Sequence, residues 1–383
     1  MYNNNVINKV ETSLNKSMRE FLMLLYYACQ DKKDVSKKIK DYDLDDIYDI
    51  CFSTGLTALV DYILEKNNII DSKFIDTRDI IIAFSIMFNY EIEQLCDYLE
   101  ENKVKNILVK GMAIRNTYPN EYLREMGDCD ILIEKANREI VKNYLLSQDY
   151  SDGSDIDNYH DAYILNNMVI EVHYLLIEGG LNNKWKAFNQ QAMDNSIALD
   201  GKQYCHQLNI NDHYIYLIQH GYKHEILKGI GIRFLLDIWF YRKYYKDDLD
   251  YEYIDKTLSE MEILDYERHV YELAQLLFEK GIDNIDLDED LEKEIVLYIL
   301  SGANNGALND GQIIQNVDEV KGKGWLDIYL YSLKQLDDRP KWYAFHSPFA
   351  YKHKWYRPIY LFGLSVKKVL NNPIKILDLY GKD

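Results

Sequence analysis

The chain has 383 residues, of which 47% are hydrophobic, so it can bury one large core or two moderate ones. It carries 63 acidic and 44 basic side chains, for a formal net charge of −19. That charge repels phosphate backbones and no basic run offsets it, so we expect no nucleic-acid partner. The apolar runs fall well short of the ~20 residues that a membrane span needs, so we expect no membrane partner either.

The cysteines are few and widely spaced. They are five in number and form no C-x-x-C pair: Cys29, Cys51, Cys96, Cys129 and Cys205. This pattern argues against a disulfide framework and against a zinc site, and it fits a reducing compartment. The first residues lack a basic stretch followed by an apolar block, so we expect no signal peptide and a cytoplasmic protein.

Residues 1–103 are expected to form an N-terminal helical region. Its clearest helix is predicted to begin near Asp76, whose side chain can cap free backbone N–H groups. Apolar residues then recur at spacings of three and four from Ile81 to Leu99, which indicates one buried stripe on a helix.

Residues 104–204 change to a strand-and-helix pattern. We predict two buried strands, a helix between the second strand and a hairpin, and a hairpin turn at Asn166-Asn167, a pair that tolerates positive φ. A short helix after the first strand is stopped by Pro119. The predicted ranges are 107–109 and 129–133 for the strands, 137–148 for the helix, and 159–166 and 169–176 for the hairpin.

Residues 205–383 return to a helical period, strongest over 212–227 and 233–245 and weaker to about 335. The tail is aromatic, and we expect its rings to pack a terminal segment rather than line a substrate site; they are Trp342, Tyr343, Phe345, Trp355 and Tyr356. The predicted fold is therefore α+β and mostly helical, with a small mixed-sheet core packed against N-terminal and C-terminal helical regions.

Two carboxylates stand at the start of the second strand. Residues two apart in a strand point to the same face, so Asp128 and Asp130 should project side by side. Carboxylates that close repel each other unless a cation lies between them, and oxygen-only ligation suits Mg²⁺. Asp155 and Asp157 repeat the spacing nearby, but without strand context they indicate a solvated loop.

The later strand offers a third carboxylate. Glu171 and His173 share one face of an otherwise apolar strand, where an unpaired charge is costly. Glu171 is predicted to complete the metal site or to act as general base on an incoming hydroxyl. His173 is predicted to contact a phosphate or orient Glu171, with a structural histidine bonded to backbone as the alternative.

The turn after the first strand suits a phosphate. Gly111 leaves free backbone N–H groups, and Lys110 adds a positive charge beside it. Arg124 offers a bidentate fork for phosphate oxygens. The structural alternatives are that Lys110 only neutralises nearby carboxylates and that Arg124 pairs with Asp128 or Glu125.

The runs K-G-x-A, Y-P, R-x-M-x-D-x-D-I-L-I and E-V-H-Y, over about residues 104–176, resemble a family of uncharacterised bacterial nucleotidyltransferases. That family belongs to the superfamily of DNA polymerase β-like folds. The resemblance implies that Asp128, Asp130 and Glu171 are metal ligands and that Gly111, helped by Lys110, is the phosphate-loop glycine. It implies Mg²⁺ or Mn²⁺ as cofactor and a nucleoside triphosphate as substrate. It extends weakly into the helices around 220–238.

Two helical pairs after residue 205 have simpler explanations. His220 and His224 are four apart, a spacing that can bind zinc, but no third ligand stands out and a polar helix face is favoured. Arg233 and Asp237 are also four apart and are most simply an intrahelical ion pair.

The residues favour an enzyme that transfers a nucleoside monophosphate from a nucleoside triphosphate to a hydroxyl of a small-molecule or protein acceptor, releasing pyrophosphate. The alternative is a catalytically inactive nucleotide-binding or partner-binding module with the same fold. It is favoured by Met112, since the wider superfamily usually has serine after the turn glycine. A metal-dependent phosphohydrolase is a weaker option because the histidines are too scattered.

Overall fold

The computed structural model describes residues 13–153, 160–177, 179–227 and 229–302, together with residues 352, 353 and 357. The predicted aromatic cluster at 342–356 and the Asp155/Asp157 pair lie outside the described residues. None of the helices in the described ranges is long and apolar enough to cross a membrane.

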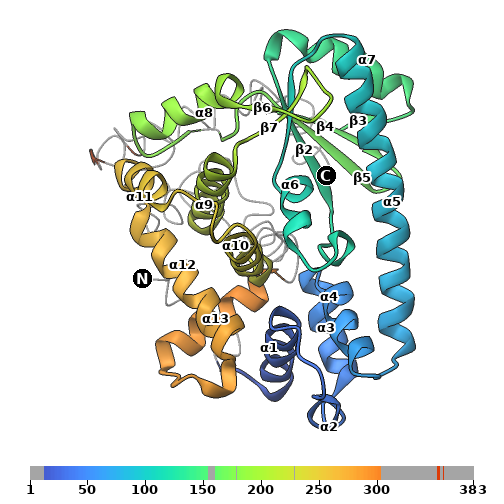
Figure 1. Ribbon diagram of the computed structural model, residues 1–383, viewed down its shortest axis with the longest axis vertical. Helices are drawn as coiled ribbons and strands as arrows, with labels where there is room; N and C mark the ends of the chain where they lie inside the picture. The colour runs from blue at the N-terminus through green and yellow to red at the C-terminus, as the bar shows by residue number, and fades with distance from the viewer. Residues whose placement is uncertain are drawn as a thin grey trace, which may run out of the picture.

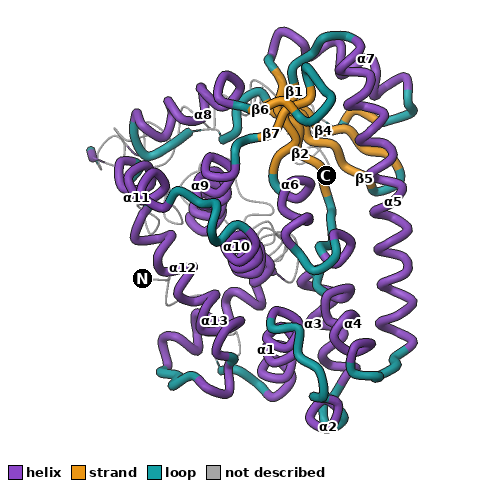
Figure 2. The backbone as a smooth tube through the Cα atoms, viewed as in Figure 1, coloured by secondary structure: helices purple, strands orange, loops and turns teal. Residues whose placement is uncertain are grey.

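Most of the described chain is helical (Figures 1 and 2). The N-terminal helices are α1 (Lys16–Cys29), α2 (Ser36–Ile39), α3 (Leu44–Thr54), α4 (Thr57–Lys66) and α5 (Ser72–Glu101). Helices α6 (Gly111–Ile114), α7 (Arg138–Ser147) and α8 (Asn183–Asn195) alternate with strands. The later helices are α9 (Ile210–Leu227), α10 (Ile232–Tyr244), α11 (Tyr251–Glu260), α12 (Leu264–Gln275) and α13 (Glu289–Gly302).

The strands form one mixed sheet with the order β3-β4-β5-β2-β1-β7-β6. Their bounds are β1 (Asn106–Val109), β2 (Asp128–Ile133), β3 (Ser151–Asp152), β4 (His160–Leu165), β5 (Met168–His173), β6 (Ile197–Ala198) and β7 (Cys205–Gln207). Strand β2 pairs antiparallel with β1 and parallel with β5, and β1 pairs parallel with β7. The predicted α+β class is confirmed.

The local predictions around the sheet hold closely. Strands β1, β2, β4 and β5 and helix α7 match their predicted ranges to within a few residues. Asn166 and Asn167 have φ of 47° and 68°, as the hairpin turn requires. Helix α5, however, begins at Ser72 rather than near Asp76, because Asp71 accepts hydrogen bonds from the backbone N–H groups of Lys73 and Phe74.

The two faces of β2 serve different purposes. Cys129, Ile131 and Ile133 are buried in a hydrophobic cluster with residues of α5 and α7. Asp130 and Leu132 point the opposite way, and Leu132 packs in the other hydrophobic cluster with residues of α9 and α10. The sheet therefore has a dry face under α5 and α7 and a second face that carries the carboxylates (Figure 1).

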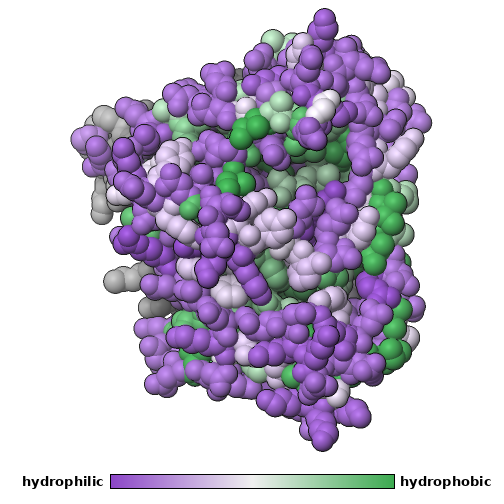
Figure 3. All heavy atoms as spheres, viewed as in Figure 1, coloured by the Kyte–Doolittle hydropathy of each residue, from purple (hydrophilic) through white to green (hydrophobic). Residues whose placement is uncertain are grey.

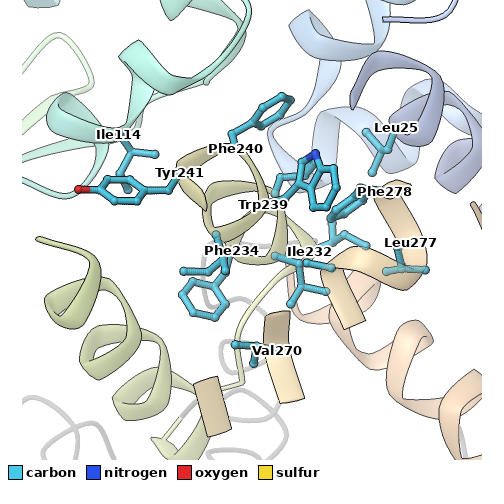
Figure 4. Close-up of a cluster of buried hydrophobic side chains, with 14 of the residues drawn as sticks. Leu25, Ile114, Ile232, Phe234, Trp239, Phe240, Tyr241, Val270, Leu277 and Phe278 are labelled. Atoms are coloured by element: carbon cyan, nitrogen blue, oxygen red, sulfur yellow. The ribbon is translucent and has the colours of Figure 1, made fainter. Parts of the chain in front are cut away.

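Helix α10 lies at the centre of the larger hydrophobic cluster (Figure 4). Side chains from α1, α6, α12 and the π-helical turn Leu276–Lys280 converge on it, among them Leu25, Ile114, Val270 and Phe278. This cluster spans the N-terminal helices, the sheet and the C-terminal helices, so helices from both ends of the chain share one core with the sheet.

Helices α9 and α10 approach closely at one glycine. A Cβ added at Gly221 would lie 2.2 Å from Cζ of Phe234, well inside van der Waals contact. Only a hydrogen at this position leaves room for the far end of the Phe234 ring against α9. The distance between α9 and α10, and hence the placement of α9 against the sheet, depends on this contact.

The visible surface is mainly hydrophilic, as the acidic composition requires (Figure 3). Apolar residues gather along α5, where Ile80, Ile86, Met87 and Tyr90 are exposed. The predicted stripe from Ile81 to Leu99 covers only part of this 30-residue helix: Phe88, Ile92, Leu95 and Leu99 are buried.

Candidate metal and nucleotide site

The strand register brings two carboxylates together. Asp130 of β2 lies directly opposite Glu171 of β5 in the parallel pair, and Asp128 lies opposite Val169. Asp130 is only 1% exposed, whereas Asp128 is exposed to solvent. The three carboxylates therefore share one face of the sheet. Asp130 is buried, Glu171 is partly exposed and Asp128 is exposed.

His173 joins the same face, two residues beyond Glu171. Its Nε2 atom lies 2.6 Å from Oδ1 of Asp130 and 3.2 Å from Oε2 of Glu171. Burial alone would lower the pKa of His173, but the hydrogen bonds to these two carboxylates raise it. The ring of His160, on the neighbouring β4, stacks on the His173 ring with centroids 5.3 Å apart. Sequence reasoning missed His160, because only the hairpin register brings it there.

Lys110 completes the cluster from the end of β1. Its Nζ donates to Oδ1 of Asp130, and its side chain is largely buried. Burial alone would lower the pKa of Lys110, but Asp130, Asp128 and Glu171 raise it, so the amine stays charged. Its backbone has φ 53° and ψ −123°, a conformation that costs a non-glycine residue about 1–3 kcal/mol and that clusters at functional sites.

The charges of these groups are coupled. Burial alone would raise the pKa of Asp130, but Lys110 and His173 lower it. The hydrogen bond from His173 lowers the pKa of Glu171. The protein atoms around Asp128 desolvate its carboxylate and so raise its pKa, and the charge of Asp130 raises it further. Three carboxylates thus face one ammonium group, that of Lys110, and one imidazole, that of His173.

Asp130, Glu171 and His173 are the described residues that could hold a metal ion together. Their ligand atoms all lie within 4.8 Å of one another. Of the residues predicted as metal ligands, two are in this group, while Asp128 is not one of the three. His173, predicted as a nucleotide contact, is the third.

Arg124 is held by a residue far away in the sequence. Its Nε and Nη2 atoms each lie 2.8 Å from one carboxylate oxygen of Asp237 on α10, a bidentate pair, and the Tyr118 hydroxyl donates to the same carboxylate. Asp237 therefore pairs with Arg124. The helical spacing had predicted Arg233 as its partner, and that prediction is wrong. Arg124 in turn pairs with neither Asp128 nor Glu125.

Gly111 is required by the position of Arg124. A Cβ at Gly111 would lie 2.7 Å from Nη1 of Arg124, so the guanidinium packs directly on the turn after β1. The Asp237 carboxylate holds one edge of the guanidinium and Nη1 is directed at this turn. The phosphate contact predicted for Arg124 stays a prediction, with Nη1 as the donor it would use.

Glu125 has a structural role that the sequence did not reveal. Its Oε1 accepts from the backbone N–H of Ala58, 3.1 Å away, at the first turn of α4. Arg233 donates to the backbone carbonyl of Glu125. Arg124 and Glu125 lie just before β2. Arg124 attaches this strand to α10, and Glu125 attaches it to α4.

Helix α9 faces the carboxylates from the side opposite α5. Tyr216 is buried and lies near Lys110, Asp130 and Glu171, whose charges act on its hydroxyl. His220 is one turn further along, and burial followed by the nearby charge of Lys110 lowers its pKa well below the usual range. The His220 and His224 rings are 4.3 Å apart. The described residues place no three-ligand metal group around this pair.

The buried His213, also on α9, should make the free energy of unfolding depend on pH. Burial, followed by the charge of Arg124, lowers its pKa to about 4, although Asp237 partly opposes this. Between pH 6.5 and 4 the unfolded chain therefore binds a proton at this site that the folded chain does not. The free energy of unfolding should have its full value above pH 6.5 and fall by roughly 3 kcal/mol as the pH drops towards 4.

Urea denaturation across this pH range measures the effect. His213→Phe keeps a ring against Tyr241, whose ring is 5.4 Å from that of His213, and removes the titrating group. The variant should lose less stability on acidification than the wild type. Parallel curves for the two proteins would show that His213 does not titrate as its burial requires.

The sequence comparison identifies the class of the protein. The model of a family described as uncharacterised nucleotidyltransferases matches residues 40–279, well over half of the chain. The chain belongs to this uncharacterised nucleotidyltransferase family. No curated protein matches it.

A comparison of folds returns the antibiotic-resistance factor ANT(2'')-Ia, whose structure was determined in solution. It is 8% identical over 49% of this chain and 98% of that chain, with a TM-score of 0.35. A likeness this distant adds nothing to the assignment, which rests on the family match.

Proposed function

We propose that the protein transfers a nucleoside monophosphate from a nucleoside triphosphate to a hydroxyl of a small-molecule or protein acceptor and releases pyrophosphate. The reaction would use a divalent cation, Mg²⁺ or Mn²⁺, held by Asp130 and Glu171 with Asp128 beside them. The observation that carries the proposal is the register of β2 and β5, which sets Asp130 directly beside Glu171 in a member of a nucleotidyltransferase family.

The residues fit a cation at this site. Oδ2 of Asp130 is buried and has no hydrogen-bond partner in the part of the chain that the structure describes. A buried carboxylate oxygen without a partner is costly, and a cation would relieve that cost. When bound, the cation would neutralise triphosphate oxygens and the charge that develops during transfer.

The side chains of this chain supply the remaining chemistry. The acceptor oxygen attacks the α-phosphorus, the bond from that phosphorus to the bridging oxygen of pyrophosphate breaks, and the hydroxyl proton passes to a base. Glu171 is the proposed base, through the carboxylate oxygen that does not hold the cation, because its carboxylate is ionised and still partly exposed. Lys110, beside the Gly111 turn, is proposed to turn from Asp130 towards a phosphate oxygen when nucleotide binds.

One observation favours the inactive alternative. The Lys110 ammonium already contacts Asp130, and His173 adds a second positive charge when it is protonated, so part of the carboxylate charge is balanced without a cation. Together with Met112 in place of the serine, this arrangement suits a module that binds a nucleotide or a partner without turnover.

The two functions are separated by incubating the full chain with each nucleoside triphosphate, Mg²⁺ or Mn²⁺, and a cell extract as the source of acceptors. An enzyme releases pyrophosphate in amounts that grow with time and require the extract. A binding module shows metal-dependent nucleotide binding by calorimetry with no pyrophosphate. Pyrophosphate release that is independent of added divalent cation would contradict the proposed use of the carboxylates.

A further inference from the structure

The metal site is built with a nitrogen donor as well as oxygen donors. Nε2 of His173 faces both Oδ1 of Asp130 and Oε2 of Glu171, at 2.6 and 3.2 Å. The Lys110 ammonium already contacts Oδ1 of Asp130, whereas Oε2 of Glu171 and Nε2 of His173 still require a positive centre between them, which is a proton on Nε2 or a metal ion. The three donor atoms lie within 4.8 Å of one another, close enough for a single ion.

The backbone sets this geometry in advance. Asp130 is paired with Glu171 in the parallel register, and Leu132 is paired with His173, so all three donors stand on adjacent strands of one sheet. Stacking of the His160 ring on the His173 ring, with planes inclined by 23°, limits rotation of the imidazole. A donor set held on paired strands and by ring stacking loses little entropy when an ion binds.

The degree of exposure also favours an ion. Asp130 is buried and its Oδ2 lacks a partner among the described residues, whereas the Glu171 side chain is 27% exposed and that of His173 15%. The site thus has a buried anchor and two donors that solvent can reach. An ion can enter from the side of Glu171 and His173 and still find a desolvated carboxylate at the base of the site.

Donor chemistry then distinguishes between cations. Mg²⁺ prefers oxygen ligands and retains water, while imidazole suits divalent transition metals. We propose that Asp130, Glu171 and His173 together bind one divalent transition-metal ion, with the His173 imidazole as a direct ligand, and that the protein therefore prefers divalent transition-metal ions, Mn²⁺ among them, to Mg²⁺. This inference rests on the proposed function of the same site and names its cofactor.

The test uses the full chain, stripped of metal with chelator, and Mn²⁺ as the probe. Calorimetry should show Mn²⁺ binding at least ~10-fold tighter than Mg²⁺. Pulsed electron paramagnetic resonance should show coupling of the manganese to a directly bound nitrogen, and heavy-nitrogen labelling of histidine alone should change that coupling. The labelling needs no variant, so it tests the proposal even if a substitution unfolds the chain.

Two variants then assign the nitrogen. His173→Gln can keep an oxygen near the position of Nε2 and should lose the nitrogen coupling, with Mn²⁺ affinity lowered ~10–100-fold and Mg²⁺ affinity changed far less. His160→Phe keeps a flat ring against His173 and should retain the coupling. Coupling that survives His173→Gln, or that disappears in His160→Phe alone, overturns the assignment.

The outcomes separate this inference from the proposed function. Pyrophosphate release with Mg²⁺ as effective as Mn²⁺, and manganese bound without any nitrogen coupling, would refute the nitrogen ligand and leave the nucleotidyl transfer intact. Mn²⁺ binding with nitrogen coupling but no transfer under any condition would support the ligand and refute the enzyme. Absence of any metal binding that depends on Asp130 would refute both.

Discussion

Replacing Asp130 with asparagine is expected to lower the rate of nucleotidyl transfer by about 1,000-fold or more. Among the described carboxylates, Asp130 alone contacts both Lys110 and His173, and it lies opposite Glu171. Removing its charge deprives a bound cation of its buried ligand, and a loss of three powers of ten corresponds to about 4 kcal/mol of transition-state stabilisation. Initial rates of pyrophosphate release measure the effect.

Asp194→Asn is the matched control. Asp194 is exposed on α8, so the same chemical change there should leave the rate unaltered. Circular dichroism of the Asp130→Asn protein separates lost chemistry from lost folding. Full activity in a folded Asp130→Asn variant would remove the metal site from the mechanism.

The Arg124→Met variant is expected to be destabilised by about 3–5 kcal/mol. The Arg124 and Asp237 side chains are 10% and 8% exposed, so the substitution leaves the Asp237 carboxylate buried, with the Tyr118 hydroxyl as its one remaining hydrogen-bond partner among the described residues. Breaking a buried ion pair from one side carries a cost of this size because the remaining charge stays desolvated. Urea denaturation followed by circular dichroism measures it.

The double variant Arg124→Met with Asp237→Leu should recover much of the lost stability, because no buried charge is then left unpaired. Lys142→Met serves as the control: Lys142 pairs with Asp152 at the surface, where loss of an ion pair has little effect. If Arg124→Met were as stable as the wild type, the link between the carboxylate strand and α10 would not be structural.

Which strand residues share a face could be predicted, because successive side chains alternate between the two faces of a strand. Alternation along β2 and β5 placed Asp128 with Asp130 and Glu171 with His173 before any tertiary contact was known. The hairpin at Asn166-Asn167 followed from the tolerance of asparagine for positive φ. Each of these inferences uses neighbours in the chain.

The contacts that complete the site could not be predicted because they join distant segments. Arg124 and Asp237 are separated by 113 positions, and the intrahelical partner Arg233 was the simpler choice on spacing. The short strands β6 and β7 gave no alternation to detect, and β7 joins the sheet through a parallel pairing with β1. The stacking of His160 on His173 depends on the hairpin register and on rotamers that no local pattern specifies.

The sequence left open whether Lys110 contacts a phosphate or only neutralises nearby carboxylates. A glycine turn after a strand indicated free N–H groups, and the lysine looked like an accessory charge. In the folded chain Lys110 itself adopts the positive φ, and its amine contacts Asp130. Gly111 allows the close approach of Arg124, and the phosphate contact predicted for this turn stays a prediction.

The fate of the phosphates of the nucleoside triphosphate distinguishes nucleotidyl transfer from every other reaction that the site could support. The full chain is incubated with Mn²⁺, cell extract and nucleotide labelled at either the α- or the γ-phosphorus. Nucleotidyl transfer predicts an acceptor that carries the α-label and never the γ-label, with the signal abolished in Asp130→Asn. An acceptor that carries the γ-label, or an α-labelled acceptor formed equally well by Asp130→Asn, would contradict the account.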